Sequence, residues 1–411
     1  MRRIKTGYFF LILAVLAFVQ TDTEAQVKTG IDVLVERDFD ILKGKRVGLV
    51  TNPTGVDSHL RSTIDILFEH VDLRALFGPE HGVRGDFSAG DHVGDQVDKK
   101  TGIPVYSLYG KNRKPAPEML EDVDVIVYDI QDIGVRSYTY ISTMGLVMEA
   151  AAELDKEVVI LDRPNPLGGE RVEGPLVKEG FHSFVSQYTI PYIYGLTCGE
   201  LARLLNGEGM LKEGASCHLE VVPMEGWRRE MTFAQTGLQW VPTSPHIPYS
   251  STALLYPATG IIGELDPNMI GIGYTLPFQT LVTEEVDAGR LADSLNALGL
   301  TGVVFRPIHL KPYYMAKKGE PLQGVQIHLT DPAGAVLTGI QFLFLQEARK
   351  INPAFDPFLG KEDRYRMFDY VCGSDWLRKS MMDDFNFEKL RGNWNSDSDG
   401  FRRLSQKYIL Y

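Results

Sequence analysis

The sequence predicts an α/β protein, in which a Rossmann-like, doubly wound, mostly parallel sheet is followed by a second, smaller α+β domain. In the first half of the chain, short runs of Val, Ile and Leu alternate with amphipathic stretches. Strands buried on both faces have this composition. Segments rich in Gly, Pro and Asn follow the runs and indicate turns. Past residue 240, the proline- and serine-rich WVPTSPHIPYSS is typical of a crossing between domains.

The first domain is expected to contain strands at 46–51, 73–77, 104–109, 123–128 and 157–161, with helices near 60–68 and over 143–154. Thr197 is expected to open a further helix, because Glu200 stands at the capping-box position. The smaller domain is expected to contain strands at 279–283, 303–307 and 324–329, a helix over 340–350, and a charged helical region that ends in KYILY.

The N-terminus predicts secretion. Arg2, Arg3 and Lys5 precede the apolar run 8–19, which is shorter than the roughly 20 residues that span a bilayer. We therefore expect a signal peptide over 1–25 and no membrane anchor, with a secreted, periplasmic chain beginning near Gln26. No Cys follows the run, so a lipoprotein anchor is not expected. The remaining length suggests a Rossmann-like catalytic domain over 26–250 and a C-terminal domain over 251–411 that closes the cleft.

Composition and motifs narrow the function. A formal net charge of −12 argues against a nucleic-acid-binding surface. The first strand-to-helix turn, TNPTG, lacks G-x-G-x-x-G, so no nicotinamide or flavin cofactor is expected. Cys198, Cys217 and Cys372 allow at most one disulfide, with Cys198–Cys217 favoured by separation, and do not support a zinc site.

Four segments fall at predicted strand ends, namely TNPTG, GPEHG, YDIQDIGVRSYTY and DRPNPLGGERVEGP. In a parallel sheet these ends line one crevice, where ligands bind. Glu80 of GPEHG is the candidate central acid, because glycosidic cleavage needs a protonated carboxyl group. His81 is expected to orient Glu80 or to bond a sugar hydroxyl, and Asn52 of TNPTG is a candidate substrate contact. The alternative is a turn whose Glu and His are merely solvated.

The other two segments offer Asp129, Asp132, Arg136, Tyr138, Tyr140, Asp162, Arg163, Asn165 and Glu173. Asp129 is a candidate second catalytic carboxylate, although an Asp at a strand end also caps helices. Arg136 and Arg163 are candidate anion clamps, because guanidinium grips a carboxylate in bidentate fashion. A structural salt bridge is the alternative for both. Tyr138 is a candidate for presenting its ring to a sugar, with a place in the core as the alternative. Asn165 and Glu173 complete the candidate substrate contacts.

A metal site is not expected. The residues Glu80, His81, Asp86, Asp91, His92 and Asp95 are dense in potential ligands. They span several glycines and lack a recurrent ligand spacing.

The segments GPEHG, YDIQDIGVRSYTYISTMGLVMEAA and LDRPNPLGGERVEGP resemble those of the exo-β-N-acetylmuramidase (NamZ-like) glycoside hydrolase family, formerly a domain of unknown function. The resemblance runs from GIDVL at residue 30 to KYILY. It implies a Rossmann-like domain, a smaller C-terminal domain and an active site in the cleft between them. It also implies release of N-acetylmuramic acid from the non-reducing end of peptidoglycan fragments, with Glu80 as the catalytic residue.

The chain also departs from the family pattern. It reads IPYIYGLT where many members read IPVRHGMT, so Ile193 and Tyr194 replace Arg and His. Ile272 stands at another Arg position, and His246 stands in TSPHIPY where members read PSPNMPT. Two alternatives therefore remain, a related exo-acting amino-sugar hydrolase with another specificity and a non-catalytic protein that binds peptidoglycan fragments. The sequence also leaves open a retaining, inverting or substrate-assisted mechanism.

The stretch ELDPNMIGIGYTLPF of the second domain places polar residues beside glycines. We expect this loop to close over the cleft, with Glu264 or Asn268 bonding a hydroxyl or acetamido group of the sugar. The alternative is that these polar groups only satisfy the turn.

Overall fold

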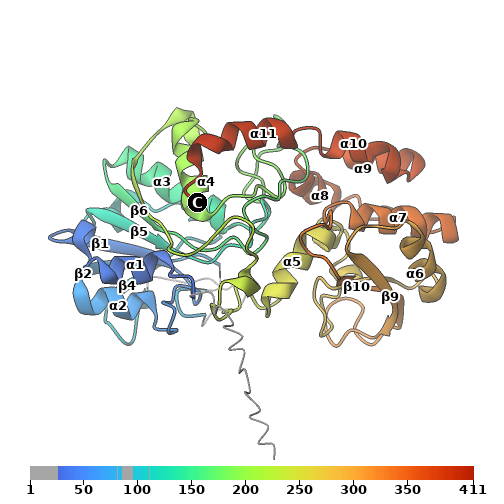
Figure 1. Cartoon of the computed structure of the whole chain (residues 1–411), viewed down its shortest axis with the longest axis horizontal. Coiled ribbons are helices and arrows are strands. Elements are labelled where there is room, and N and C mark those ends of the chain that lie inside the picture. The colour runs from blue at the N-terminus through green and yellow to red at the C-terminus, as the bar shows by residue number, and fades with distance from the viewer. Residues whose placement is uncertain (1–25, 81, 86–95, 111) are drawn as a thin grey trace, which may run out of the picture.

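The computed structural model describes residues 26–80, 82–85, 96–110 and 112–411. The chain forms two lobes that lie side by side (Figure 1). The first lobe contains a seven-stranded sheet and the second a three-stranded sheet. Within the residues that the structure describes, no helix has the length and apolar character needed to cross a membrane.

The sheet of the first lobe has the strand order of a Rossmann fold. Its strands are β1 (Arg46–Thr51), β2 (Asp72–Gly78), β3 (Gln96–Val97), β4 (Pro104–Ser107), β5 (Val125–Asp129), β6 (Glu157–Leu161) and β7 (His218–Val222). They are ordered β3-β4-β2-β1-β5-β6-β7. β3 runs antiparallel to β4, and the other pairs are parallel. The order reverses between β1 and β5, so the loops after these strands flank the crevice at the switch point.

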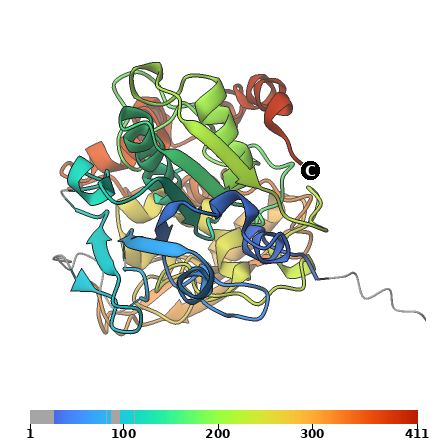
Figure 2. The same ribbon diagram turned by 90° about the vertical axis from the view of Figure 1, so that its left-hand side faces the viewer.

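Helices cover both faces of this sheet (Figure 2). They are α1 (Gly30–Glu36), α2 (Thr63–His70), α3 (Tyr140–Glu153) and α4 (Cys198–Gly207). Along β5, Val125 and Val127 pack with α1 and α2, whereas Ile126 and Tyr128 pack with α3 and α4. Successive side chains of a strand point to opposite faces. The continuous apolar runs in the sequence follow from this two-sided burial.

The second lobe packs helices against an antiparallel sheet. Its strands are β8 (Thr280–Thr283), β9 (Val303–Leu310) and β10 (Leu322–Leu329), in the order β8-β10-β9. Its helices are α5 (Ser250–Thr259), α6 (Ala288–Ala297), α7 (Ile340–Ile351), α8 (Tyr365–Cys372), α9 (Trp376–Asp384) and α10 (Phe387–Trp394), and α11 (Ser398–Ser405) follows them in the chain. The core of this lobe extends into the first through Ile133, Val135 and Ile193. The two lobes therefore share apolar packing.

Short 3-10 helices lie in the connections. They are η1 (Asp40–Leu42), η2 (Pro117–Leu120), η3 (Lys212–Gly214), η4 (Phe233–Gln235), η5 (Ile262–Glu264), η6 (Pro267–Ile270) and η7 (Gln406–Tyr408).

The C-terminal end of the chain returns to the first lobe, where Figure 1 shows α11 and the C-terminus beside α4. The Tyr411 hydroxyl donates to Asp162 at 2.7 Å, and the Leu410 amide donates to Glu200 at 2.9 Å. The expected change of domain near residue 250 stays a prediction. The KYILY end, which the sequence placed in the C-terminal domain, packs on the first lobe.

The predicted elements agree in part with those of the structure. β1 and β6 have the predicted bounds, and the capping box of Thr197 and Glu200 is present. α2 begins at Thr63 rather than near residue 60, because Leu60 has a left-handed backbone with φ of +64°. β7 was missed, because it is only partly buried and lacks a continuous apolar run. The disulfide favoured by separation is wrong, since all three cysteines are free.

Candidate active site

A cavity of about 320 Å³ opens between the lobes. Its described lining is Glu80, Ser137, Tyr138, Thr139, Tyr140, Val185, Ser244, Pro245, His246 and Tyr256. Glu80 follows β2, and the segment with Tyr138 leads from β5 into the first residue of α3, Tyr140. The remaining wall includes the interdomain crossing and α5. The cavity therefore lies beyond the carboxyl ends of β2 and β5, where a doubly wound sheet binds its ligands.

Glu80 is held on the turn that directly follows β2 and is half-buried. β4 runs parallel to β2, with Gly78 opposite Ser107. This register brings Tyr109, just beyond β4, close to Glu80. Burial and the neighbouring Glu80 carboxyl group raise the pKa of the Tyr109 hydroxyl above its ordinary value of 10.0. The Glu80 carboxylate thus faces the cavity with a neutral hydroxyl group beside it. His81, together with Asp86, Asp91, His92 and Asp95, lies outside the described residues.

Tyrosine rings form a rigid wall of the cavity. Tyr138 makes edge contacts with Tyr140 and Tyr256, at centroid distances of 5.1 and 5.7 Å. The Tyr138 hydroxyl donates to Oγ1 of Thr243 at 2.7 Å, and the Tyr140 hydroxyl donates to the Thr243 carbonyl at 2.5 Å. Burial raises the pKa of all three phenols, which keeps them neutral. Tyr138, predicted as a substrate contact, therefore lines the cavity with its ring held in place.

Asn52 lies beneath this wall at the end of β1, with 2% of its surface exposed. Its Oδ1 accepts hydrogen bonds from the amide and hydroxyl of Thr54, at 2.9 and 2.5 Å. Its Nδ2 is buried close to the Tyr140 hydroxyl, without the geometry of a hydrogen bond. Asn52 is not among the described lining residues and supports the cavity from below.

Asp129 and Arg163 form a buried ion pair rather than presenting their charges to the cavity. Nε and Nη2 of Arg163 donate to the two Asp129 oxygens at 2.5 and 2.8 Å. The Asp129 side chain is 0% exposed and that of Arg163 is 6% exposed. Thr63 also donates to Asp129, and Arg163 donates to the carbonyl of Val56. The two charges are thus paired with each other, and neither residue is among the described lining of the cavity, where a catalytic carboxylate and an anion clamp were expected.

Arg136 is likewise committed to the protein interior. Its guanidinium donates to the hydroxyl of Ser186 at 3.1 Å and to the carbonyls of Pro175, Ile190 and Val371 at 2.7, 2.6 and 3.0 Å. Burial lowers its pKa to about 10. Val371 belongs to α8 of the second lobe, so Arg136 links the lobes. This network replaces the expected grip on a substrate carboxylate.

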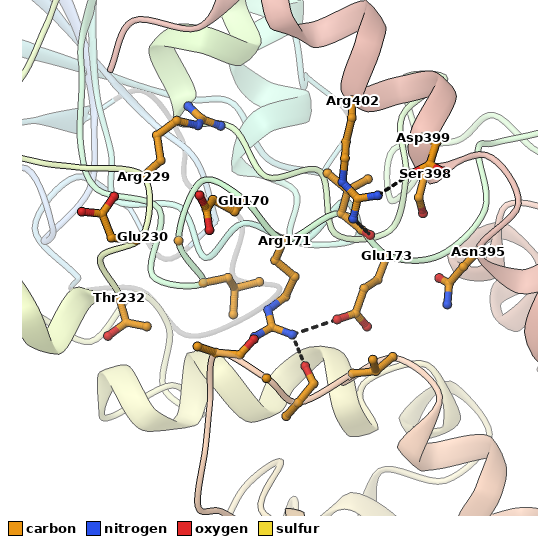
Figure 3. A pocket seen from close by; sticks show the side chains of 17 residues that line it. Glu170, Arg171, Glu173, Arg229, Glu230, Thr232, Asn395, Ser398, Asp399 and Arg402 are labelled. Carbon is orange, nitrogen blue, oxygen red and sulfur yellow. Dashed lines mark hydrogen bonds and ion pairs between the residues drawn. The ribbon is translucent and has the colours of Figure 1, made fainter. Parts of the chain in front are cut away.

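Glu173 lies in a second, polar pocket of about 500 Å³ at the interlobe boundary. In Figure 3, Arg171 and Glu173 point toward the segment of the second lobe that precedes α7. Glu173 pairs with Arg171 at 2.9 Å and accepts hydrogen bonds from the amides of Leu337 and Thr338, both at 2.9 Å. Arg171 donates to carbonyls of the same segment. Glu173 therefore fastens the two lobes together, which replaces its expected contact with substrate.

Asn165 and Asn268 each satisfy backbone groups. The Asn165 amide donates to the Leu196 carbonyl at 2.9 Å and accepts from the Leu167 amide at 2.9 Å. Asn268 donates to the Ile272 carbonyl at 2.9 Å and accepts from the Lys317 amide at 3.1 Å. Both side chains are buried by protein. They act on loop geometry and do not line the cavity.

Glu264 follows α5 and lies outside the described lining of the cavity. It forms a 3.5 Å ion pair with Arg364. Burial raises the pKa of Glu264, and Arg364 partly offsets that effect. Its charge also contributes to the raised pKa of Tyr256. Glu264 is thus engaged by Arg364 outside the described lining of the cavity, and its direct contact with a sugar stays a prediction.

Two features of the site were not predicted. Tyr256 of α5 and Tyr109 were not identified as candidates, although Tyr109 stands at the end of a predicted strand. The rule that selected Glu80 applies equally to Tyr109. Tyr256 carried no such signal, because it reaches the cavity only through the packing of the second lobe against the first.

The departures from the family pattern fall at different places. Ile193 and Ile272 are buried in the core shared by the lobes, whereas His246 lines the cavity. The Tyr194 hydroxyl donates to Asp132, which also accepts from the Gly134 amide at 2.7 Å. In the part of the chain that the structure describes, the second Asp132 oxygen is buried without a hydrogen-bond partner. Burial raises the pKa of Asp132 to about 6.

Asp132→Asn is expected to stabilise the protein at neutral pH but not in acid. The pKa of Asp132 is about 6 in the folded protein and has its ordinary value of 3.8 in the unfolded chain, so the folded protein holds this proton more tightly. The stabilisation that results is complete below pH 4 and is lost as the pH rises through 6. At pH 8 the substitution should therefore raise the unfolding free energy by up to about 3 kcal/mol relative to its effect at pH 4. Urea unfolding of both proteins at the two pH values measures this difference. If the difference in unfolding free energy between the two proteins were the same at both pH values, the raised pKa of Asp132 would be contradicted.

Groups of three or more His, Cys, Asp or Glu side chains that could hold a metal ion do not occur among the described residues. Most of the ligand-rich stretch noted in the sequence lies outside them.

Comparisons with known proteins agree with the fold and with the resemblance. Residues 47–251 match the model of the N-terminal domain of exo-beta-N-acetylmuramidase NamZ, and residues 254–411 match the model of its C-terminal domain. The chain is 42% identical over 396 residues to the peptidoglycan beta-N-acetylmuramidase NamZ of Bacillus subtilis, covering 95% of this chain and 93% of the relative.

Two crystal structures of DUF1343 family proteins from Bacteroides fragilis are similar. One has 57% identity and a TM-score of 0.90, and the other 27% and 0.72. Each match covers 94% of this chain and 99% of the other. The chain therefore belongs to the exo-β-N-acetylmuramidase NamZ family and is a glycoside hydrolase.

Proposed function

We propose that this protein is a secreted exo-β-N-acetylmuramidase that releases N-acetylmuramic acid from the non-reducing end of peptidoglycan fragments. The observation that carries the proposal is the Glu80 carboxylate in the tyrosine-walled cavity between the lobes. The name of the 42% identical B. subtilis relative supports the substrate. The basic start and apolar run of residues 1–25 support secretion, which N-terminal sequencing of the mature protein tests.

Glu80 is proposed as the general acid. In its protonated form it gives its proton to the glycosidic oxygen as the bond from that oxygen to the anomeric carbon breaks, so the leaving sugar departs as a neutral alcohol. A water molecule finally supplies the hydroxyl group that takes its place at the anomeric carbon. Tyr109 lies beside the carboxyl group, and its raised pKa keeps its hydroxyl group neutral there. The rings of Tyr138 and Tyr256, which touch each other, bound the cavity and suit it to one terminal sugar.

One observation favours a second candidate, an exo-β-N-acetylglucosaminidase. N-acetylmuramic acid differs from N-acetylglucosamine by a lactyl ether with a carboxylate. Arg136 and Arg163, the expected partners of that carboxylate, are fully engaged within the protein. Among the described lining residues, only His246 can carry a positive charge. A cavity with little positive charge also suits the neutral sugar.

A panel of nitrophenyl β-glycosides separates the two candidates. The N-acetylmuramide is expected to be turned over with a higher kcat/KM than the N-acetylglucosaminide, and the glucoside should be inert. Initial rates of nitrophenol release give these values. A preference for the N-acetylglucosaminide would establish the second candidate, and no turnover of any glycoside together with calorimetric binding of muropeptides would favour a binding protein.

A further inference from the structure

The second lobe contains a hollow of about 660 Å³ away from the Glu80 cavity. It lies where β8 and β9 end and β10 begins. Its lining is Tyr274, Glu284, His309, Leu310, Lys311, Tyr313, Pro321, Leu322 and Gln323. Aromatic and aliphatic side chains make up much of this lining, with polar side chains among them. Sites that bind small polar molecules combine these features.

The hollow contains a stacked pair of tyrosines. The rings of Tyr274 and Tyr313 lie 5.6 Å apart with an angle of 11° between their planes. Tyr274 packs against the apolar cluster beneath it, whereas 64% of Tyr313 is exposed. The following residues, Tyr314 and Met315, are each 45% exposed. Large apolar side chains that gather on a surface mark an interaction site.

The loop that carries Tyr313 connects this hollow with the Glu80 cavity. The Tyr314 hydroxyl lies 2.9 Å from Nε2 of His246, and the two rings are nearly parallel at 6.2 Å. His246 lines the Glu80 cavity. Of two consecutive residues in this loop, Tyr313 therefore lines the hollow and Tyr314 contacts a residue of the cavity wall.

This loop is held in a fixed position. The Tyr313 amide donates to the Gly273 carbonyl at 2.7 Å, and the Lys317 amide donates to Oδ1 of Asn268. Gly273 has a φ of +98°, and a Cβ atom there would lie 2.6 Å from the Tyr314 carbonyl. Lys317 also bonds Glu284 at 2.6 Å. The buried Asn268 thus positions the loop that bears the tyrosines.

We infer that the Tyr274–Tyr313 hollow binds sugars of the glycan on the leaving-group side of the scissile bond. The inference rests on the proposed function and identifies a site for the rest of its substrate. A pyranose has an apolar face of C–H groups and a rim of hydroxyls. Its face fits the exposed ring of Tyr313, and its rim faces His309, Lys311 and Gln323, which can donate hydrogen bonds. Connection with the cavity through Tyr314 favours a strand of sugars as the occupant.

Tyr313→Ala should make the enzyme less able to use long substrates. For the parent and the variant, kcat/KM is measured on nitrophenyl β-N-acetylmuramide and on a peptidoglycan tetrasaccharide that begins with N-acetylmuramic acid. The ratio of the tetrasaccharide value to the nitrophenyl value is expected to fall roughly two- to tenfold, through KM, because a stacking contact is lost. Tyr313→Phe retains the ring and should restore the ratio.

Phe68→Ala is the matched control, because it removes an exposed ring on α2 of the other lobe. It should leave the ratio unchanged. An unchanged ratio in Tyr313→Ala would overturn the inference, as would an equal loss in Phe68→Ala. Calorimetric titration of Glu80→Gln with the same tetrasaccharide, with and without Tyr313→Ala, needs no turnover. It therefore tests the hollow even if the parent proves inactive on muramides, a result that would refute only the proposed function.

Discussion

Glu80→Gln is expected to reduce kcat on a peptidoglycan disaccharide that begins with N-acetylmuramic acid by about two to four orders of magnitude, the usual contribution of a general acid, because a departing sugar needs the proton. The amide has nearly the shape of the carboxyl group but has no acidic proton to give to the glycosidic oxygen. Glu80 is only half-buried and has no ion-pair partner among the described residues, so the fold should not depend on its charge. Steady-state rates at saturating substrate measure the loss.

Glu170→Gln is a suitable control for this experiment. Glu170 is an exposed carboxylate of the same lobe that lines the polar pocket of Figure 3 rather than the Glu80 cavity. Its removal should leave kcat unchanged. Thermal unfolding should be nearly the same for the parent and both variants. If Glu80→Gln retained the activity of the parent, another group would have to supply the proton, and Glu80 would lose its assignment.

Most strands could be predicted because the signal for each one lies within its own short stretch of sequence. A strand of a doubly wound sheet needs apolar residues toward both faces, so RVGLVT and EVVIL are recognisable without their partners. β7 escaped prediction for the same reason, because a partly buried strand such as HLEVV lacks this signal. The three-stranded sheet of the second lobe was likewise found from short apolar runs, although β9 and β10 extend beyond the predicted bounds.

The candidate site was predictable only in part. The ends of the strands meet at one edge, and this rule selected Glu80 and Tyr138 together with Arg136, Arg163 and Glu173. This rule does not identify the residue with which each charged side chain interacts. Arg136 is engaged by Val371 and Glu173 by Leu337, residues far along the chain in the other lobe. A polar side chain at a sheet edge therefore serves substrate or structure according to contacts that the sequence does not reveal.

Asp129→Asn tests this distinction and should destabilise the protein by about 3–5 kcal/mol, because it leaves the Arg163 guanidinium buried without its counter-charge. Urea unfolding followed by circular dichroism measures the change. The exposed Arg61–Glu69 pair, with an N–O distance of 3.1 Å, provides the control, and Glu69→Gln should cost at most about 1 kcal/mol. If Asp129 instead acted on substrate, kcat would decrease greatly while the free energy of unfolding changed little. If the pair is structural, the unfolding free energy should fall and kcat should change little. The folded fraction of the variant keeps an intact Glu80 cavity and should turn over substrate close to the parent rate.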